Sequence, residues 1–222
     1  MEGARARNAW DALAECASEP NPFLESWYLL PALRAWDPHE DVQLLRFEAG
    51  GDLAGLVPLS RERSYYGRAI PHRAVWTHPN AFLGVPLVAA GMEKAFWRTF
   101  LAWLDDNAGL ALFLHLYDMP LDGPLHAALR EVLAEQNRAS ALVFSQERAM
   151  LRTDAAPEAY FAASLSGKKR KELRRQLARL GEMGEVAFER ETGGEDLAGW
   201  TEEFLALEAA SWKGKAGSAM AS

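Results

Sequence analysis

"MEKAFWRTFLAWLDDNAGLALFLHLY", residues 92–117, is the stretch that decides the fold class. Its first half places four apolar residues at helical spacing, and Gly109 can end that helix. These four are Phe96, Phe100, Leu101 and Leu104. The second half, "LALFLHLY" (110–117), predicts a buried strand. A helix followed by a strand of this length is typical of a domain in which helices alternate with the strands of a sheet.

The same alternation continues on both sides of this stretch. Downstream, "PLHAALREVLAEQN" (124–137) predicts a helix and "ALVFSQERAML" (141–151) predicts another strand. Upstream, two short apolar runs around Gly50-Gly51 predict a β-hairpin over residues 42–62. Further elements are expected as helices at 8–17 and 24–36, and as edge strands and loops at 68–88. The expected fold class is therefore α/β (α+β), with a mixed sheet flanked by helices.

A domain boundary is expected near "RTDAAPEAY" (152–160), which divides the chain into residues 1–155 and 156–222. The sequence of the second part predicts helices at 157–164, 168–180 and 196–212, and one strand at 185–191. One strand cannot make a sheet. We therefore expect either that this domain continues beyond residue 222 or that it borrows its sheet from the first domain.

The predicted helix in "SLSGKKRKELRRQLARLGEMG" (164–184) is strongly basic, although the whole chain has a net charge of −7. Residues 168–179 hold seven basic side chains and one acid, Glu172. On a helical wheel, four of the cations fall within about 80° of one another, and three leucines lie opposite them. We call these four cations, Lys168, Lys171, Arg175 and Arg179, the cationic ridge.

Two interpretations of the cationic ridge remain open. It is either a solvated surface that balances the negative charge of the rest of the chain, or a site that binds anions. The anion would be a phosphate of a nucleotide cofactor, of tRNA or of a lipid head group. Like charges at this spacing repel by a few tenths of a kcal/mol per pair. A surface that served only solubility would mix the two signs instead.

Several common catalytic motifs are absent from the sequence. Ala162 stands where a P-loop before Gly167-Lys168 needs a glycine, and neither G-x-G-x-x-G nor G-x-S-x-G occurs. The single cysteine excludes an internal disulfide and a multi-thiolate metal site, so we expect no metal. We interpret His72 and His78 as structural or solvent-exposed, His115 as a hydrogen-bonded core residue, and Glu208 as part of a solvated helix face.

The sequence contains no run of 18 apolar residues and no apolar signal core at its N-terminus. We therefore expect no transmembrane segment and a cytoplasmic location.

The order of several segments resembles a known family. These segments include "YGRAIPH", "FLGVPLV", "LSGKKRKELRRQLARLGEMG" and "FLALEAASWKGKAGSAMA". Together they resemble the BioF2-like acetyltransferase domain of the GNAT superfamily, which includes CelD-type proteins of cellulose or exopolysaccharide biosynthesis. The domain is also similar to the FemAB peptidyltransferases.

This resemblance implies two GNAT-like halves, a degenerate one at 1–155 and the incomplete start of an acetyltransferase domain at 156–222. It implies acyl transfer from acetyl-CoA or another acyl-CoA to an amine or a glycan-linked acceptor. The pyrophosphate signature Q/R-x-x-G-x-G/A does not occur, so the resemblance places the CoA-binding loop beyond residue 222 and leaves this chain alone inactive. The alternatives are aminoacyl transfer from tRNA, or a non-catalytic module that binds RNA or an anionic surface through helix 168–179.

Overall fold

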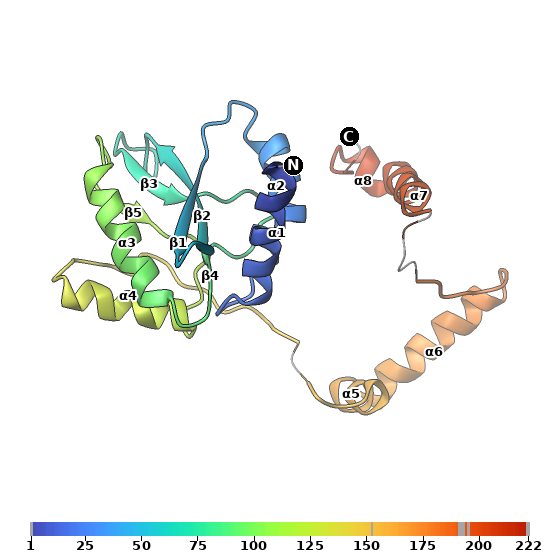
Figure 1. Ribbon diagram of the computed structural model, residues 1–222. Coiled ribbons are helices and arrows are strands. Elements are labelled where there is room, and N and C mark those ends of the chain that lie inside the picture. Colours follow the sequence, from blue (N-terminus) through green and yellow to red (C-terminus); the bar gives the residue numbers. More distant parts are fainter. Residues whose placement is uncertain (1, 152, 191–193, 195, 221–222) are drawn as a thin grey trace. The chain divides into compact units, whose positions relative to one another are not determined.

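The computed structural model describes residues 2–151, 153–190, 194 and 196–220. The chain divides into two compact units, Met1–Ser145 and Gln146–Ser222. Each unit is described by itself, and Figure 1 labels the elements of both.

The first unit is built on a mixed five-stranded sheet. The strands are β1 (Gln43–Ala49), β2 (Asp52–Glu62), β3 (His72–Val75), β4 (Leu87–Val88) and β5 (Leu114–His115). The sheet has the order β1-β2-β3-β5, and β4 also pairs with β2. β3 and β5 run parallel, whereas the other pairs are antiparallel. The predicted hairpin is confirmed, with Gly50 and Gly51 at φ of +63° and +93°, the left-handed region that its turn requires.

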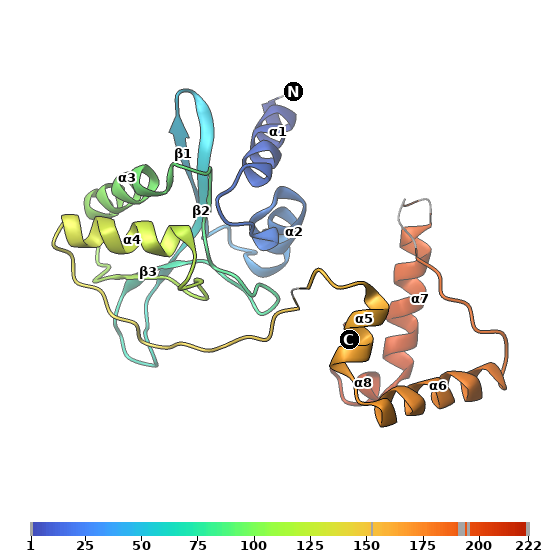
Figure 2. The ribbon, with the colours of Figure 1, turned by 90° about the horizontal axis from the view of Figure 1, so that it is seen from below.

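Helices cover both faces of this sheet (Figures 1 and 2). On one face lie α1 (Glu2–Glu15), the short 3₁₀ helix η1 (Pro22–Leu24) and α2 (Ser26–Trp36). On the other face lie α3 (Glu93–Asp106) and α4 (Pro124–Glu135). Successive side chains of β2 point to opposite faces of the sheet and so pack against both helix layers. Leu56 packs with α1 and α2, whereas Val57 and Leu59 pack with α3 and α4. The predicted mixed sheet flanked by helices is confirmed.

Two predicted strands in the first two thirds of the chain differ from the structure. Only Leu114–His115 of the stretch 110–117 forms a strand, and the side chains of Leu110 and Leu112 are exposed. Residues 141–151 form no strand, and Leu142, Val143 and Phe144 are exposed. An apolar run shows strand propensity, but it becomes a strand only where a free sheet edge offers backbone partners.

The second unit is helical in its described residues. Its helices are α5 (Pro157–Ser164), α6 (Gly167–Gly181), α7 (Leu197–Ala210) and α8 (Trp212–Lys215). The predicted helices at 157–164 and over the basic segment are confirmed. The helix predicted at 196–212 is interrupted at Ser211, whose hydroxyl accepts a hydrogen bond from the backbone N–H of Lys213 (3.2 Å) and so starts α8. The strand predicted at 185–191 is wrong over 185–190, and residue 191 lies outside the described residues.

The second unit has almost no buried side chains of its own. Among its described residues only Glu208 and Ala219 are buried. The apolar stripe predicted on α7 is present but uncovered, with exposed fractions between 38% at Trp200 and 75% at Leu207. Of the three leucines opposite the cationic ridge, Leu173 is half-buried, whereas Leu177 is 47% and Leu180 is 53% exposed. The helices of this unit therefore form without the apolar partner that their amphipathic pattern calls for.

Candidate functional site

The start of α6 is fixed by local hydrogen bonds. The hydroxyl of Ser166 accepts from the backbone N–H of Lys169 (3.3 Å), as an N-cap does. The guanidinium of Arg170 donates to the carbonyl oxygen of Leu165 (2.9 Å) and to that of Ala162, at the end of α5. One of the seven basic side chains therefore joins two helices rather than facing a ligand.

The four residues of the cationic ridge lie together on the exposed side of α6. Glu172 interacts instead with Lys169, at 3.4 Å, and with the amide of Gln176, also at 3.4 Å. Within the described part of the chain, none of the four ridge cations forms an ion pair. The helix therefore presents a row of charges that its own carboxylate does not neutralise.

The start of α6 is an electrostatically costly position for cations. Lys168 stands in the first turn, where the helix dipole disfavours positive charge, and Lys171 follows directly after that turn. The first backbone N–H groups of a helix also lack intrahelical partners. An anion at this end interacts favourably with both the side chains and the dipole. The arrangement can therefore bind phosphate groups, with two lysines near the helix start and two arginines farther along.

The prediction that Glu208 belongs to a solvated helix face is wrong. Its side chain is buried at 7% exposure. The carboxylate accepts from Nζ of Lys213 and from the backbone N–H of Met220 (2.8 Å). These hydrogen bonds lower the pKa of Glu208. A carboxylate held this firmly in its ionised form is a poor general base, so its role is to join α7, α8 and the segment at 220.

The histidines lie in aromatic clusters of the first unit. His72 and His78 are both buried, which confirms a structural position, but they belong to different clusters. Nδ1 of His72 lies 3.1 Å from the carbonyl oxygen of Ile70. Burial and the nearby His72 lower the pKa of His115. The expectation of a hydrogen-bonded His115 is wrong, because its buried Nδ1 has no partner among the described residues.

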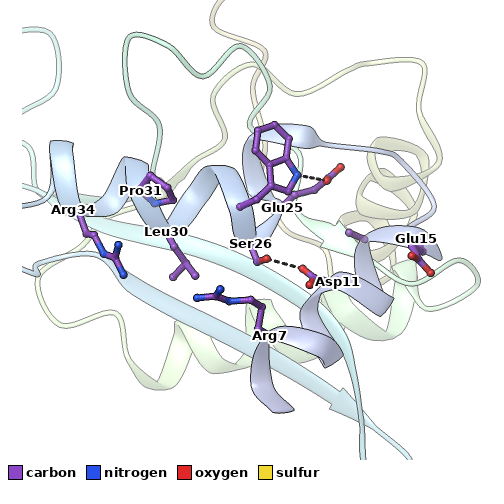
Figure 3. Close-up of a pocket in the computed structure, with 10 residues that line it drawn as sticks. Arg7, Asp11, Glu15, Glu25, Ser26, Leu30, Pro31 and Arg34 are labelled. Carbon is purple, nitrogen blue, oxygen red and sulfur yellow. Dashed lines mark hydrogen bonds between the residues drawn. The ribbon is translucent and has the colours of Figure 1, made fainter. Parts of the chain in front are cut away.

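A groove of about 510 Å³ lies between α1 and α2, and Figure 3 shows the residues that line it. Arg7 and Arg34 extend toward each other past Leu30 in this view. The hydroxyl of Ser26 donates to Asp11 (2.6 Å), and Glu15 also lines the groove. Because charges of both signs line it, the groove selects an anion less clearly than the cationic ridge does.

One segment of the chain, which contains the cationic ridge and helices α7 and α8, is similar to a family of known enzymes. Residues 167–222 match the family model of the acetyltransferase (GNAT) domain. The match begins at the first residue of α6. No curated protein matches the chain significantly. Among solved structures, an apo aminoglycoside antibiotic 6'-N-acetyltransferase from Acinetobacter haemolyticus is similar, at 13% identity and a TM-score of 0.37. That similarity covers 65% of this chain and 94% of the other.

The described residues contain no group of three or more His, Cys, Asp or Glu side chains placed to hold a metal ion. None of the helices in the described ranges is long and apolar enough to span a bilayer.

Proposed function

We propose that this chain is part of a GNAT-type acyltransferase that moves an acyl group from acyl-CoA to an amine or a polysaccharide-linked acceptor. The observation that carries the proposal is the match of residues 167–222 to the acetyltransferase (GNAT) domain. The unpaired cationic ridge within the same segment supports it, because the donor is a polyanion.

The residues present fit the phosphates of the donor in part. Lys168 and Lys171 place two ammonium groups near the helix start, and Arg175 and Arg179 add guanidinium groups that hold phosphate oxygens in a bidentate manner. The sequence offers no Q/R-x-x-G-x-G/A loop to cradle the pyrophosphate with backbone N–H groups. The ridge therefore supplies charge, which attracts and orients a phosphate, but not the cradle itself.

The transfer follows from the chemistry of a thioester. A bond forms between the acceptor nitrogen or oxygen and the acyl carbon, and the bond from that carbon to sulfur breaks. The sulfur leaves as a thiolate and takes up a proton, while the acceptor proton passes to a base or to water. Hydrogen-bond donors at the carbonyl oxygen stabilise the charge that develops there.

The finer part of the proposal concerns the two halves of the chain. Residues 1–155 are proposed as a degenerate GNAT-like copy, and residues 156–222 as the start of the acyltransferase domain. The resemblance to BioF2-like and CelD-type proteins supports a glycan-linked acceptor in exopolysaccharide or cellulose biosynthesis. A cytoplasmic location is part of the same proposal.

The test is a calorimetric titration of acetyl-CoA into the chain, repeated with a variant that carries Lys168→Glu and Arg175→Glu. Because the resemblance places the pyrophosphate loop beyond residue 222, we expect weak but saturable binding to the parent chain through the cationic ridge alone, and its loss in the variant. Equal binding of acetyl-CoA to both proteins would show that the cationic ridge is not part of the donor site. Acetyl-CoA that binds neither would remove the support that the ridge gives to acyl transfer.

The second candidate function is binding of RNA, either for aminoacyl transfer from tRNA or without catalysis. It is favoured by the row of unpaired cations on α6. Titration of tRNA at several salt concentrations separates the two candidates. RNA binding predicts an affinity that falls steeply with salt, since each neutralised phosphate releases counterions. Tight, salt-dependent tRNA binding without acetyl-CoA binding would favour this candidate over acyl transfer from CoA.

A further inference from the structure

Part of the sheet face that packs against α1 and α2 carries polar and aromatic side chains instead of aliphatic ones. Register places Ser60 beside Ala74, and Ala74 beside His115, on strands β2, β3 and β5. One step along, Glu62 lies beside His72. Since side chains two residues apart share a face, Trp76 and Tyr117 follow on the same side. This region of the face therefore combines a carboxylate, a hydroxyl and aromatic rings.

A hollow of about 250 Å³ opens among these side chains. It is lined by Ser60, Glu62, Val75, Trp76, Thr77 and Tyr117. The hydroxyl of Ser60 donates to Oε1 of Glu62 (2.7 Å), which holds the carboxylate in place. Among the described residues Glu62 has no ion-pair partner, so its carboxylate is held in one position but its charge is not neutralised.

The aromatic walls of the hollow are held by further ring contacts. Tyr117 stacks on His115, with ring centroids 3.9 Å apart and an angle of 18° between the planes. Trp76 contacts the buried His78 with centroids 5.3 Å apart. Burial and the charge of Glu62 raise the pKa of Tyr117, so the phenol stays neutral. The hollow therefore has two fixed aromatic side chains and a single negative charge.

We infer that this hollow binds the ammonium group of a small organic amine. Glu62 supplies the charge and a hydrogen-bond acceptor, and Trp76 and Tyr117 supply ring faces that attract a cation. The negative charge disfavours a phosphate or carboxylate ligand. A metal ion is disfavoured because no further carboxylate or histidine lines the hollow. The inference goes beyond the proposed acyl transfer and does not depend on it.

The experiment compares benzylamine, which is protonated at neutral pH, with benzyl alcohol, its neutral counterpart of nearly the same shape. Each is titrated into the full chain and followed by the NMR signals of the tryptophan indole N–H groups, among which Trp76→Phe identifies that of Trp76. We expect saturable binding of benzylamine that shifts the Trp76 signal, and binding of benzyl alcohol roughly tenfold weaker or more.

Two variants and a control test the residues. Glu62→Gln keeps the size of the side chain and the acceptor for Ser60, and we expect it to weaken benzylamine binding roughly tenfold or more. Tyr117→Leu keeps the charge and removes one ring, and it should weaken benzylamine more than benzyl alcohol. The matched control is Glu48→Gln on β1, an exposed glutamate paired with Arg46 at 2.7 Å, and it should leave the affinity unchanged.

The melting temperature of each variant shows whether it has folded. Equal affinities of benzylamine and benzyl alcohol, or an unchanged affinity in folded Glu62→Gln, would overturn the inference. So would the absence of any benzylamine binding to the parent chain. If Glu62→Gln does not fold, the comparison of the charged and neutral ligands on the parent chain decides the question.

Discussion

At the scale of single residues, Glu19 shows how a buried carboxylate ties the first unit together. It lies before α2, is 9% exposed, and accepts a hydrogen bond from the backbone N–H of Leu125 (2.7 Å) in the first turn of α4. α4 has no cap from the side chain of its own N-cap residue, Gly123. Glu19 therefore satisfies an amide of α4 across 106 residues of sequence.

Burial raises the pKa of Glu19 above its ordinary value of 4.5, although the hydrogen bond from Leu125 opposes this. The folded chain thus holds the proton more tightly than the unfolded chain. The free energy of unfolding should fall as pH rises from 4.5 through the raised pKa. Glu19→Gln keeps an acceptor but cannot ionise, so this part of the pH dependence should vanish. Urea unfolding at a series of pH values measures it.

The control for Glu19→Gln is Glu15→Gln, on an exposed residue of α1, which should leave the slope of stability against pH unchanged. An identical slope in the parent chain and in Glu19→Gln would contradict the prediction.

Gly214 is a second residue whose identity the structure explains. A Cβ atom at this position of α8 would overlap the backbone carbonyl of Ala209 in α7. Gly214→Ala should therefore separate the two helices and weaken the hydrogen bond from Met220 to Glu208. Amide hydrogen exchange at Met220, measured by NMR, should become faster. Gly181→Ala in α6, where a Cβ meets no atom within 4 Å, should leave that exchange rate unchanged.

At the scale of elements, the cationic ridge of α6 gives the sharpest test of binding. Lys168→Glu with Arg175→Glu should abolish the binding of acetyl-CoA and of other polyanions, because the local charge is reversed. The melting temperature should stay unchanged, since both side chains are exposed and unpaired among the described residues. Calorimetric titration and thermal denaturation together check this. Arg5→Glu with Arg130→Glu makes the same change of net charge on exposed positions of α1 and α4 and should bind as the parent does.

The elements also show what the sequence can predict and why. Helices α3 and α6 follow from periodicity, and α6 also from its N-cap at Ser166, which are local properties of the chain. The strand expected at 141–151 is missing, and so is the strand expected at 185–191 over its described residues 185–190, because a strand depends on a partner edge that periodicity does not reveal. The cationic ridge was visible as a spacing of charges. The burial of Glu208 was not, because it depends on a turn at Ser211 that brings Lys213 and Met220 to the carboxylate. The hollow beside Glu62 likewise depends on strand register.

At the scale of the whole molecule, the two units differ in what stabilises them. The first unit buries two apolar clusters, which include Trp97 and Leu59 on one side of the sheet and Leu13 and Leu29 on the other. Each such side chain contributes about 1.5–3 kcal/mol on full burial. The second unit buries only Glu208 and Ala219 among its described residues. The hydrophobic contribution to folding therefore comes almost wholly from the first unit.

This difference predicts how fragments of the chain behave. A fragment of residues 1–145 should unfold in one cooperative transition, with a melting temperature close to that of the full chain. A fragment of residues 146–222 should show helical circular dichroism that declines gradually on heating, because its helices lack a shared core to couple them. Thermal denaturation followed at 222 nm distinguishes the two. A sigmoidal transition in the second fragment would mean that its exposed leucines and aromatic residues do pack together. If acetyl-CoA produces a second sigmoidal transition in the full chain, besides that of the first unit, the ligand organises the helices of the second unit.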